Sequence, residues 1–210
     1  MSDYQPIIDA IVKCQRDDIK NLTQQALDKG TAAQDILDNG FIAGMAIVGE
    51  KMESGDMFIP EVLMAAQIMN QGMEVLKPSL GNGNENKKGK VVIGTVKGDL
   101  HDIGKNLVAL MCKGSGLEVI DLGVDISADQ FVEAARKNNA DLVCLSALLT
   151  TTMPEMKKTI DLMEHNNLDK VKVMIGGAPV TQSFAQKIGA DGYASDAGFA
   201  AREANRLISA

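Results

Sequence analysis

The stretch VVIGTVKGDLHDIGKN at residues 91–106 decides the fold of this chain. It begins with an apolar, β-branched run, which is typical of a strand buried in a parallel sheet. A polar loop with Asp99 and His101 follows, and a helix is expected from Gly104 onward. Strand, loop and helix in this order predict a βα unit whose loop lies at the carboxyl end of the strand, where α/β proteins bind their ligands.

The same alternation continues to the end of the chain. Apolar runs predict four further strands: LEVIDL at 117–122, DLVCLSAL at 141–148, VKVMIGG at 171–177 and a short one at 192–194. Helices are expected at 104–113, 128–138, 154–166, 181–188 and 198–208. Strands that alternate with helices in this way predict an α/β domain at residues 90–210 with a flavodoxin-like, Rossmann-like sheet of five parallel strands.

The first 80 residues have helical spacing throughout and predict a separate helical bundle. Its third helix is expected at 31–39 and its fourth at 41–52. The polar stretch GNGNENKKG at 81–89 has the composition of a flexible connection. The sequence therefore predicts two domains, residues 1–80 and residues 90–210, joined by a linker.

Three details of this bundle follow from the same rules. Asp17 or Asp18 can cap the second helix, because aspartate favours the residue before a first turn. The last helix is expected to begin at Pro60, a good residue for a first turn. Its apolar spacing places Leu63 among the residues that face inward.

Composition excludes several classes of protein. The 21 basic and 28 acidic residues give a net charge of -7, and a surface of that sign repels nucleic acid. No apolar run approaches the roughly 18 residues of a membrane-spanning helix. The first residues do not resemble a signal peptide, and Cys14, Cys112 and Cys144 are widely spaced. We expect a cytoplasmic protein whose cysteines pack in the core.

Polar residues and glycines gather at the carboxyl ends of three expected strands. Asp99 and His101 follow the first strand, four hydroxyl residues from Ser146 to Thr152 follow the third, and the pair Gly176-Gly177 follows the fourth. Asp99 can accept a hydrogen bond from one imidazole nitrogen and leave the other free, as carboxylates do behind metal-binding histidines. Paired glycines let a planar group approach the backbone.

Each feature also has a purely structural interpretation. Asp99 and His101 can be a surface pair, and the two glycines can form a tight turn. Thr152 and Glu155 have the spacing of a capping box for the helix at 154–166. The second of the two histidines, His165, is expected to be solvated at the end of a polar helix.

A lone histidine cannot hold a bare metal ion, and the sequence offers no further ligands with zinc spacing. It can supply one axial ligand to a metal whose other positions are filled by a macrocycle. The pattern Asp99-x-His101-x-x-Gly104, with the later Ser146-x-Leu148 and Gly176-Gly177, resembles the cobalamin-binding signature of corrinoid proteins and of the cobalamin module of methionine synthase. The order of a bundle before a flavodoxin-like domain also matches, and GDMFIPEV at 55–62 resembles the segment that covers the corrin ring.

The resemblance implies a role for each matching residue. His101 would be the lower ligand of the cobalt in a base-off, His-on complex, with Asp99 behind it. Thr152, where methionine synthase has a serine, would complete a relay, and Phe58 would shield the upper face. The implied cofactor-binding residues are Gly98, Asp99, His101, Asp102, Gly104, Ser146, Leu148, Thr150, Thr152, Gly176, Gly177, Ala194 and Phe58. Of these, Ser146 and Thr150 would bind the displaced base or nucleotide tail, and Gly176, Gly177 and Ala194 would line its slot.

The function implied by the resemblance is that of a methyl carrier without an independent active site. Its cofactor would be cobalamin, as methylcobalamin or a related corrinoid. A substrate-specific methyltransferase would load the methyl group onto cobalt, and an acceptor methyltransferase dependent on tetrahydrofolate, another pterin or a thiol would remove it. A reductive activase is a further implied partner, whereas nucleic acid and membranes are not.

Three other classes are compatible with parts of this pattern. A cobalamin-dependent regulatory sensor combines the same two modules, but it needs an additional DNA-binding domain that this sequence lacks. A mutase subunit would need a barrel for its substrate, or a partner chain that provides one, and the first seventy or so residues cannot form a barrel. A flavodoxin-like domain for another nucleotide is disfavoured, because no GxGxxG fingerprint follows the first strand.

Overall fold

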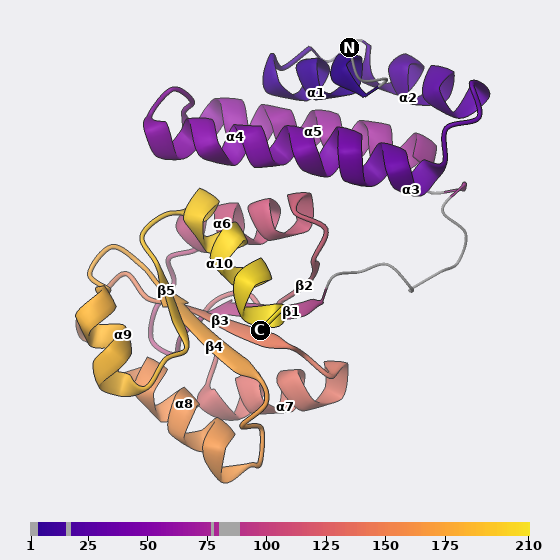
Figure 1. Cartoon of the computed structure of the whole chain (residues 1–210). Coiled ribbons are helices and arrows are strands. Elements are labelled where there is room, and N and C mark those ends of the chain that lie inside the picture. Colours follow the sequence, from indigo (N-terminus) through magenta and orange to yellow (C-terminus); the bar gives the residue numbers. More distant parts are fainter. Residues whose placement is uncertain (1–3, 16–17, 77, 80–88) are drawn as a thin grey trace. The chain divides into compact units, whose positions relative to one another are not determined.

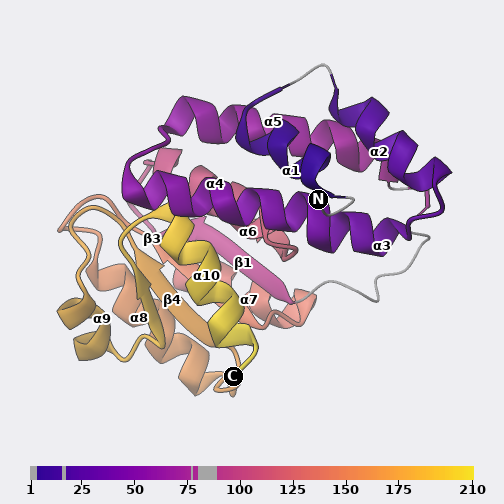
Figure 2. The same cartoon turned by 45° about the horizontal axis from the view of Figure 1, so that its top comes forward.

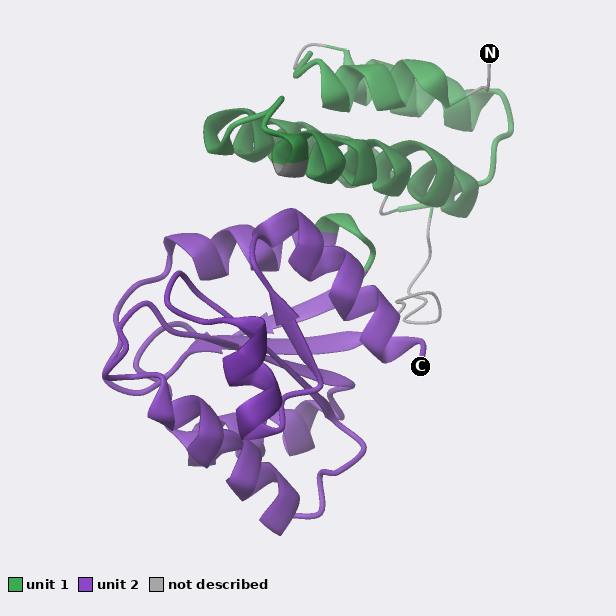
Figure 3. Ribbon diagram, turned by 60° about the vertical axis from the view of Figure 1, so that its left-hand side comes forward, with its two compact units in different colours: residues 1–86, 114–116 green, residues 87–113, 117–210 purple. Residues whose placement is uncertain are grey.

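The computed structural model describes residues 4–15, 18–76, 78–79 and 89–210 (Figure 1). The chain divides into two compact units, Met1–Asn86 with Gly114–Gly116, and Lys87–Lys113 with Leu117–Ala210 (Figure 3). Of the linker expected at 81–89, all but Gly89 lies outside the described residues. The carbonyl of Gly89 accepts a hydrogen bond from the amide of Glu118, at the start of the sheet.

The first unit is built of helices packed side by side. Its elements are α1 (Gln5–Val12), α2 (Ile19–Asp28), α3 (Ala33–Ile36), the π-helical turn η1 (Leu37–Ile42), α4 (Ala43–Ser54) and α5 (Ile59–Leu76). Phe41 and Met45 are among its fully buried side chains. Gly72 of α5 has its Cα against Phe41, and an added Cβ would lie 2.5 Å from the ring, so this position requires glycine.

Several details of this unit differ from the sequence-based expectation. The prediction of two separate helices at 31–39 and 41–52 is wrong, because α3, η1 and α4 form one uninterrupted helical run. Gly40 does not end a helix here. It is buried and lets the run pass close to α1, since a Cβ would lie 3.1 Å from Cγ2 of Ile7.

The expectations for the cap of α2 and for the buried face of α5 are also wrong in part. Asp18 is the N-cap residue of α2 but makes no side-chain capping hydrogen bond, and Asp17 lies outside the described residues. Leu63 is 45% exposed. The buried face of α5 runs through Val62, Ala65, Ala66 and Met69, so that Leu63 falls on the opposite side of the helix.

The second unit is a parallel sheet covered by helices on both faces. Its strands are β1 (Lys90–Thr95), β2 (Glu118–Asp121), β3 (Leu142–Ser146), β4 (Lys172–Gly176) and β5 (Gly192–Ala194). Its helices are α6 (Ile103–Gly114), α7 (Ala128–Asn138), α8 (Pro154–His165), α9 (Gln182–Ile188) and α10 (Ala197–Ile208). Helices α6 and α10 cover one face, and α7, α8 and α9 cover the other (Figures 1 and 2). The predicted α/β fold is confirmed, with element ends that differ by one or two residues.

The strand order β2-β1-β3-β4-β5 is that of a flavodoxin-like sheet. All neighbours are parallel, and the register pairs Thr95 with Ser146 and Ser146 with Gly176 at the carboxyl ends. The order reverses between β1 and β3, so the loops after these two strands diverge to opposite faces of the sheet. Ligands of such sheets bind at this switch point.

Apolar side chains alternate along the strands and fill the layers on each side. Val92, Val143 and Val173 pack with Phe131 of α7 and Met156 of α8 in one continuous core. Helix α7 begins with a capping box between Ser127 and Gln130.

Cys112 and Cys144 are buried in this unit, and burial raises the pKa of the Cys112 thiol to about 12. Cys14, in the first unit, is only half-buried. In the described part of the chain, no helix is both long and apolar enough to cross a membrane.

Candidate functional site

The candidate site is built on the loop that follows β1. The chain reverses at residues 96–99, where the amide of Asp99 donates to the carbonyl of Val96 at 3.1 Å. Gly98 occupies the third position of this turn with φ +80°, which a type II turn requires and which favours glycine. The turn carries Asp99 back beneath the carboxyl edge of the sheet, and His101 follows before α6 begins at Ile103.

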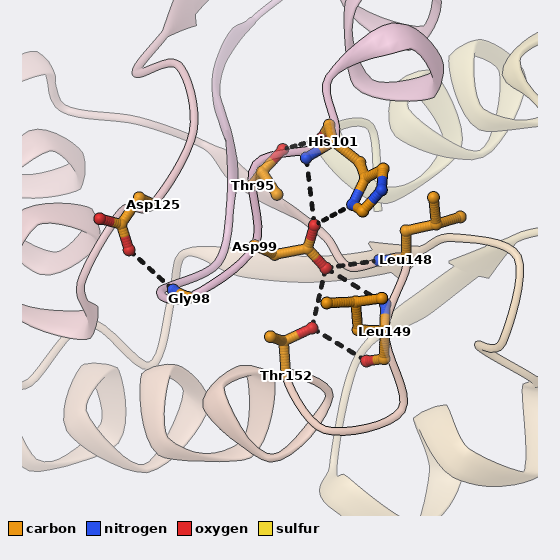
Figure 4. A network of polar contacts seen from close by, with 8 residues as sticks. All are labelled: Thr95, Gly98, Asp99, His101, Asp125, Leu148, Leu149 and Thr152. Carbon is orange, nitrogen blue, oxygen red and sulfur yellow. Dashed lines mark hydrogen bonds and ion pairs between the residues drawn. The ribbon is translucent and has the colours of Figure 1, made fainter.

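The Asp99 side chain is fully buried and saturated with hydrogen bonds (Figure 4). Its Oδ1 accepts from the backbone amide of His101 at 3.1 Å and lies 2.7 Å from His101 Nδ1. Its Oδ2 accepts from the amides of Leu148 and Leu149, at 2.8 and 3.2 Å, and from the Thr152 hydroxyl at 2.8 Å. One carboxylate therefore joins the loop after β1 to the loop after β3.

These contacts determine which nitrogen of His101 carries a proton. Burial alone would raise the pKa of Asp99, but the hydrogen bonds from His101, Leu148 and Thr152 outweigh it and hold that pKa well below its usual range. Asp99 is therefore a carboxylate and can only accept. Nδ1 of His101 must then be the donor, which leaves the lone pair of a neutral imidazole on Nε2.

The free nitrogen of His101 is open to a ligand. The His101 side chain is 52% exposed, and no described residue forms a hydrogen bond with Nε2. An imidazole that is oriented by a carboxylate and carries an exposed lone pair is the usual arrangement of a metal-binding histidine. The alternative interpretation as a simple surface pair does not hold, because the carboxylate of this pair is buried.

Thr152 takes part in this network and does not cap α8. The N-cap residue of α8 is Met153, which makes no side-chain capping bond, so the capping box expected from Thr152 and Glu155 is absent. The single hydroxyl proton of Thr152 lies within reach of Asp99 Oδ2 at 2.8 Å and of the Leu149 carbonyl at 2.9 Å. A charged acceptor makes the stronger bond, which favours Asp99.

The surface around His101 carries several exposed apolar side chains. Leu100 and Ile103, on either side of it, are 71% and 74% exposed, and Leu148 and Leu149 of the facing loop are exposed as well. Among the described residues, no three His, Cys, Asp or Glu side chains are grouped to hold a metal ion. A flat, largely apolar macrocycle that brings its own metal fits this donor set, because it needs one axial ligand and would cover these side chains.

The carboxyl ends of the neighbouring strands carry the other residues expected at the site. Ser146 is half-buried, whereas Thr150 is exposed on the loop after β3. Gly176 pairs with Ala194, and a Cβ on Gly176 would lie 3.2 Å from the Ala194 carbonyl oxygen. At Gly177, with φ +136°, a Cβ would lie 1.8 Å from the carbonyl oxygen of Ala147. Glycine at 177 is thus required by the chain's own backbone, whatever binds there.

The remaining expected residues lie at helix ends or in the other unit. Asp102 precedes α6 and accepts a hydrogen bond from the Asn106 side chain at 3.0 Å. Gly104, in the first turn of α6, faces open space, with no atom near the place of a Cβ. Phe58, in the helical unit, precedes α5 and is 69% exposed. His165, at the end of α8, is exposed as expected.

The structure adds two residues that sequence reasoning missed. The Thr95 hydroxyl donates to the carbonyl of His101 at 2.8 Å, and the Asp125 carboxylate accepts from the amide of Gly98 at 2.7 Å (Figure 4). Thr95 belongs to β1, and Asp125 follows β2. No local sequence signal marks either residue, because each contact depends on how the chain folds back.

Comparison with known proteins assigns both parts of the chain to one kind of domain. Residues 4–77 and residues 89–201 each match a family model described as a B12 binding domain. The chain is 44% identical to dimethylamine corrinoid protein 2 of Methanosarcina acetivorans over 206 residues, which cover 97% of this chain and 95% of that protein. It is also 44% identical to trimethylamine corrinoid protein 1 of the same organism, over 90% of this chain and 89% of that protein.

Solved structures agree with this result. A cobalamin-binding protein from Desulfitobacterium hafniense DCB-2 aligns over 99% of both chains with a TM-score of 0.84 and 33% identity. A chain of the methanol:cobalamin methyltransferase complex from Methanosarcina barkeri aligns with a TM-score of 0.86 and 33% identity, over 99% of this chain and 80% of that one.

Proposed function

The chain belongs to the corrinoid proteins with B12 binding domains, and from this premise we propose that it carries a methyl group on the cobalt of a corrinoid held by His101. One observation carries the assignment of the ligand. The exposed imidazole of His101 is tied through Nδ1 to the buried carboxylate of Asp99 at 2.7 Å, at the switch point of the sheet. When bound, the corrinoid supplies a cobalt atom that can accept and give up a methyl group.

The residues around His101 have distinct tasks in this proposal. Asp99 accepts the Nδ1 proton's hydrogen bond, so that Nε2 of the neutral imidazole presents its lone pair to a ligand. Thr152 and the amides of Leu148 and Leu149 keep Asp99 charged although it is buried. The network would thereby hold His101 oriented as the protein's ligand to the cobalt of a bound corrinoid.

The exposed apolar side chains and the small residues bind the rest of the group. Leu100, Ile103 and Leu148 are exposed apolar side chains near His101 and would contact a corrin ring held there. The cofactor's own base, once displaced, would enter beside the sheet near Ser146, Thr150 and Gly176, with Gly177 and Ala194 as its neighbours. Gly98 permits the turn before His101, and Asp102 and Gly104 lie after His101, where α6 begins.

The helical unit would act as the cap of the upper face. Phe58 is exposed at the start of α5, and its amide donates to the Glu61 carboxylate at 2.8 Å, which fixes the backbone before the helix. Ile59, Leu63 and Met64 continue an exposed apolar surface along the same end of α5. Residues 1–80 would then be the cap domain, residues 90–210 the cofactor domain, and 81–89 the linker that lets them separate.

The partners follow from the relatives. Proteins 44% identical to this chain are named for dimethylamine and trimethylamine, and a structural relative occurs in a methanol methyltransferase complex. We therefore propose a methylamine methyltransferase as the enzyme that loads this carrier, and a thiol- or pterin-dependent methyltransferase as the one that unloads it. A reductive activase would restore the cofactor after accidental oxidation.

Reconstitution with methylcobalamin tests the role of His101. The wild-type protein should give the spectrum of base-off, histidine-ligated cobalamin. His101→Ala should abolish that spectrum and weaken binding at least about tenfold. His165→Ala, which changes the only other histidine in the sequence, is the matched control and should behave as wild type. An unchanged spectrum in His101→Ala would refute the ligand assignment.

Methyl transfer tests the proposed donor. For this test the protein is reconstituted with aquocobalamin, which carries no methyl group, and its cobalt is reduced to cobalt(I) with an added low-potential chemical reductant. It is then incubated with purified methylamine or methanol methyltransferases and dimethylamine, trimethylamine or methanol, and formation of methylcobalamin is followed by absorbance. Transfer from a methylamine, lost in His101→Ala and kept in His165→Ala, is expected. Transfer from methanol alone would show that the donor is wrong while the carrier role stands.

A further inference from the structure

The turn that carries His101 is held from two sides by residues outside the hydrogen-bonded group His101, Asp99 and Thr152. Thr95 is fully buried at the end of β1, and its hydroxyl donates to the His101 carbonyl at 2.8 Å. Asp125 lies on the loop after β2 and contacts the turn twice. Its Oδ1 accepts from the Gly98 amide at 2.7 Å, and its own amide donates to the Asp99 carbonyl at 3.0 Å.

Asp125 reaches these two groups only in an unusual backbone conformation. Its φ is +57°, in the left-handed region that L-residues other than Asn and Asp seldom adopt. The residue is exposed, so burial does not force the conformation. A backbone arrangement that costs free energy and persists at a site has to be stabilised by its contacts, and here those contacts are with the turn before His101.

The two contacts act on different parts of the turn. Asp125 fixes the main chain at Gly98 and Asp99, and this determines where the Asp99 carboxylate lies. Thr95 fixes the main chain of His101 itself, which limits how far the imidazole can swing away from Asp99. The paired strands supply the rigidity, because Thr95 also receives a hydrogen bond from the Ile126 amide and donates its own amide to Gly123.

We propose that Thr95 and Asp125 are positioning residues that hold the Gly98–His101 turn ready for the cobalt before a corrinoid binds. The proposal rests on the axial-ligand role of His101 proposed above. We call the hydrogen bonds of Thr95 and Asp125 to this turn the brace. A turn that is held in advance loses less conformational freedom when the cofactor binds, so the affinity and the fraction of histidine-ligated cobalt should both depend on the brace.

Four variants of the full-length protein separate the loss of each hydrogen bond from changes in backbone conformation or side-chain shape. Asp125→Gly removes the carboxylate and tolerates a positive φ, whereas Asp125→Asn keeps an oxygen acceptor and also tolerates it. Thr95→Val removes the hydroxyl with little change of shape, and Thr95→Ser restores it.

Matched controls lie away from the turn. Asn139→Gly changes another residue at positive φ, 49°, at the end of α7. Thr159→Val removes another buried hydroxyl that donates to a main-chain carbonyl, on α8.

Two measurements follow the turn with and without the cofactor. In the cofactor-free protein, long-range ¹H–¹⁵N NMR of the histidine rings reports which nitrogen of His101 is protonated. Absorbance titration with aquocobalamin reports affinity and histidine ligation. Asp125→Gly and Thr95→Val should each show mixed tautomers and bind roughly three- to tenfold more weakly, the loss expected for one hydrogen bond. Asp125→Asn, Thr95→Ser and both controls should match wild type.

The outcomes separate this proposal from the proposed function. If wild type shows no histidine-ligated spectrum, the axial-ligand role fails. If wild type shows it and Asp125→Gly and Thr95→Val keep the wild-type tautomer and affinity, the brace is refuted and the ligand role stands. If Asn139→Gly and Thr159→Val lower the affinity as much as their counterparts, the effect is one of general stability, and the brace is again refuted.

Discussion

The Asp99 carboxylate shows how a charge can be kept in the interior of this protein. Burial disfavours its ionised form, yet five hydrogen bonds from His101, Leu148, Leu149 and Thr152 converge on its two oxygens. Together they hold its pKa below the usual range of an aspartate. Because the folded state favours the charged form, Asp99 stabilises the fold at neutral pH.

Replacement of Asp99 by Asn should reveal this contribution and its pH dependence. An amide side chain presents a donor where the carboxylate presents only acceptors, so the free energy of unfolding should fall by about 2 kcal/mol at pH 7. A group with a lowered pKa stabilises above its unfolded pKa of about 3.9 and loses that effect as the pH falls toward the folded value. Urea unfolding between pH 7 and about pH 3 should therefore show the gap to wild type narrowing below about pH 4.

Asp102→Asn is the control for this experiment. Asp102 is exposed and accepts one side-chain hydrogen bond, from Asn106, so its replacement should cost little at any pH. A gap between wild type and Asp99→Asn that stays constant down to pH 3 would contradict a lowered pKa of Asp99.

At the scale of elements, one buried ion pair fastens the first turn of α6 to the end of β2. The Lys105 side chain is 2% exposed, and its Nζ lies 2.6 Å from both carboxylate oxygens of Asp121. Asp121 is 32% exposed, so water reaches one partner and hardly reaches the other. Removing the Asp121 carboxylate and removing the Lys105 ammonium should therefore lower the free energy of unfolding by different amounts.

Asp121→Ala should destabilise the protein more than Lys105→Met does. Among the described residues, the first variant leaves the buried ammonium with the Asn106 side-chain oxygen, 2.7 Å away, as its remaining hydrogen-bond partner, at a cost of about 3 kcal/mol. The second keeps the apolar stem of the side chain and leaves a carboxylate that water can solvate, at a cost of about 1 kcal/mol. Urea unfolding at pH 7 measures both.

The exposed pair Lys157 and Asp161 on α8 provides the comparison. Both side chains are more than 40% exposed, so Lys157→Met and Asp161→Ala should each cost below about 1 kcal/mol and nearly the same amount. A larger loss for Lys105→Met than for Asp121→Ala would show that the buried side of the pair is not the decisive one.

Which elements the sequence could predict depends on how local their cause is. The strands were predictable because a buried parallel strand needs an unbroken apolar run, and VVIGT and LVCLS provide it. The continuous run through η1 was not, because Gly40 usually indicates a helix end and its packing against Ile7 is a tertiary contact. Leu63 was misplaced for a similar reason, since only the packed unit decides which apolar face of α5 is buried.

The site follows the same division. Asp99 and His101 are two residues apart, so their pairing could be predicted from sequence. Thr152 had a local interpretation as a cap that competed with its bond to Asp99, 53 positions away. Asp125 meets Gly98 across 27 positions and depends on a positive φ, which no pattern in the sequence indicates.

At the scale of the whole molecule, the α/β unit has a sheet and a buried core of its own. A core cluster within it runs from Val92 to Ile188 and includes side chains from all three helices of one face. The sheet begins at Lys90, and the Gly89 carbonyl already pairs with Glu118. Every residue proposed at the site except Phe58 lies in this part of the chain.

A fragment of residues 89–210 should therefore fold and bind the cofactor without the helical unit. We expect one cooperative urea transition with a slope of about 1–3 kcal/mol per molar, typical of a small domain. With methylcobalamin the fragment should give the same histidine-ligated spectrum as the full chain, because His101, Asp99 and Thr152 keep their supports. Light should remove the methyl group faster from the fragment, and Phe58→Ala in the full chain should show part of that increase.

The results can separate folding from capping. A fragment that folds cooperatively but lacks histidine ligation would mean that the helical unit contributes to the lower face, against the division of tasks proposed here. Equal photolysis rates in fragment, Phe58→Ala and wild type would remove the cap from the proposal. Faster photolysis in the fragment with an unchanged rate in Phe58→Ala would assign the shielding to other residues of the helical unit, of which Ile59, Leu63 and Met64 are the exposed apolar candidates.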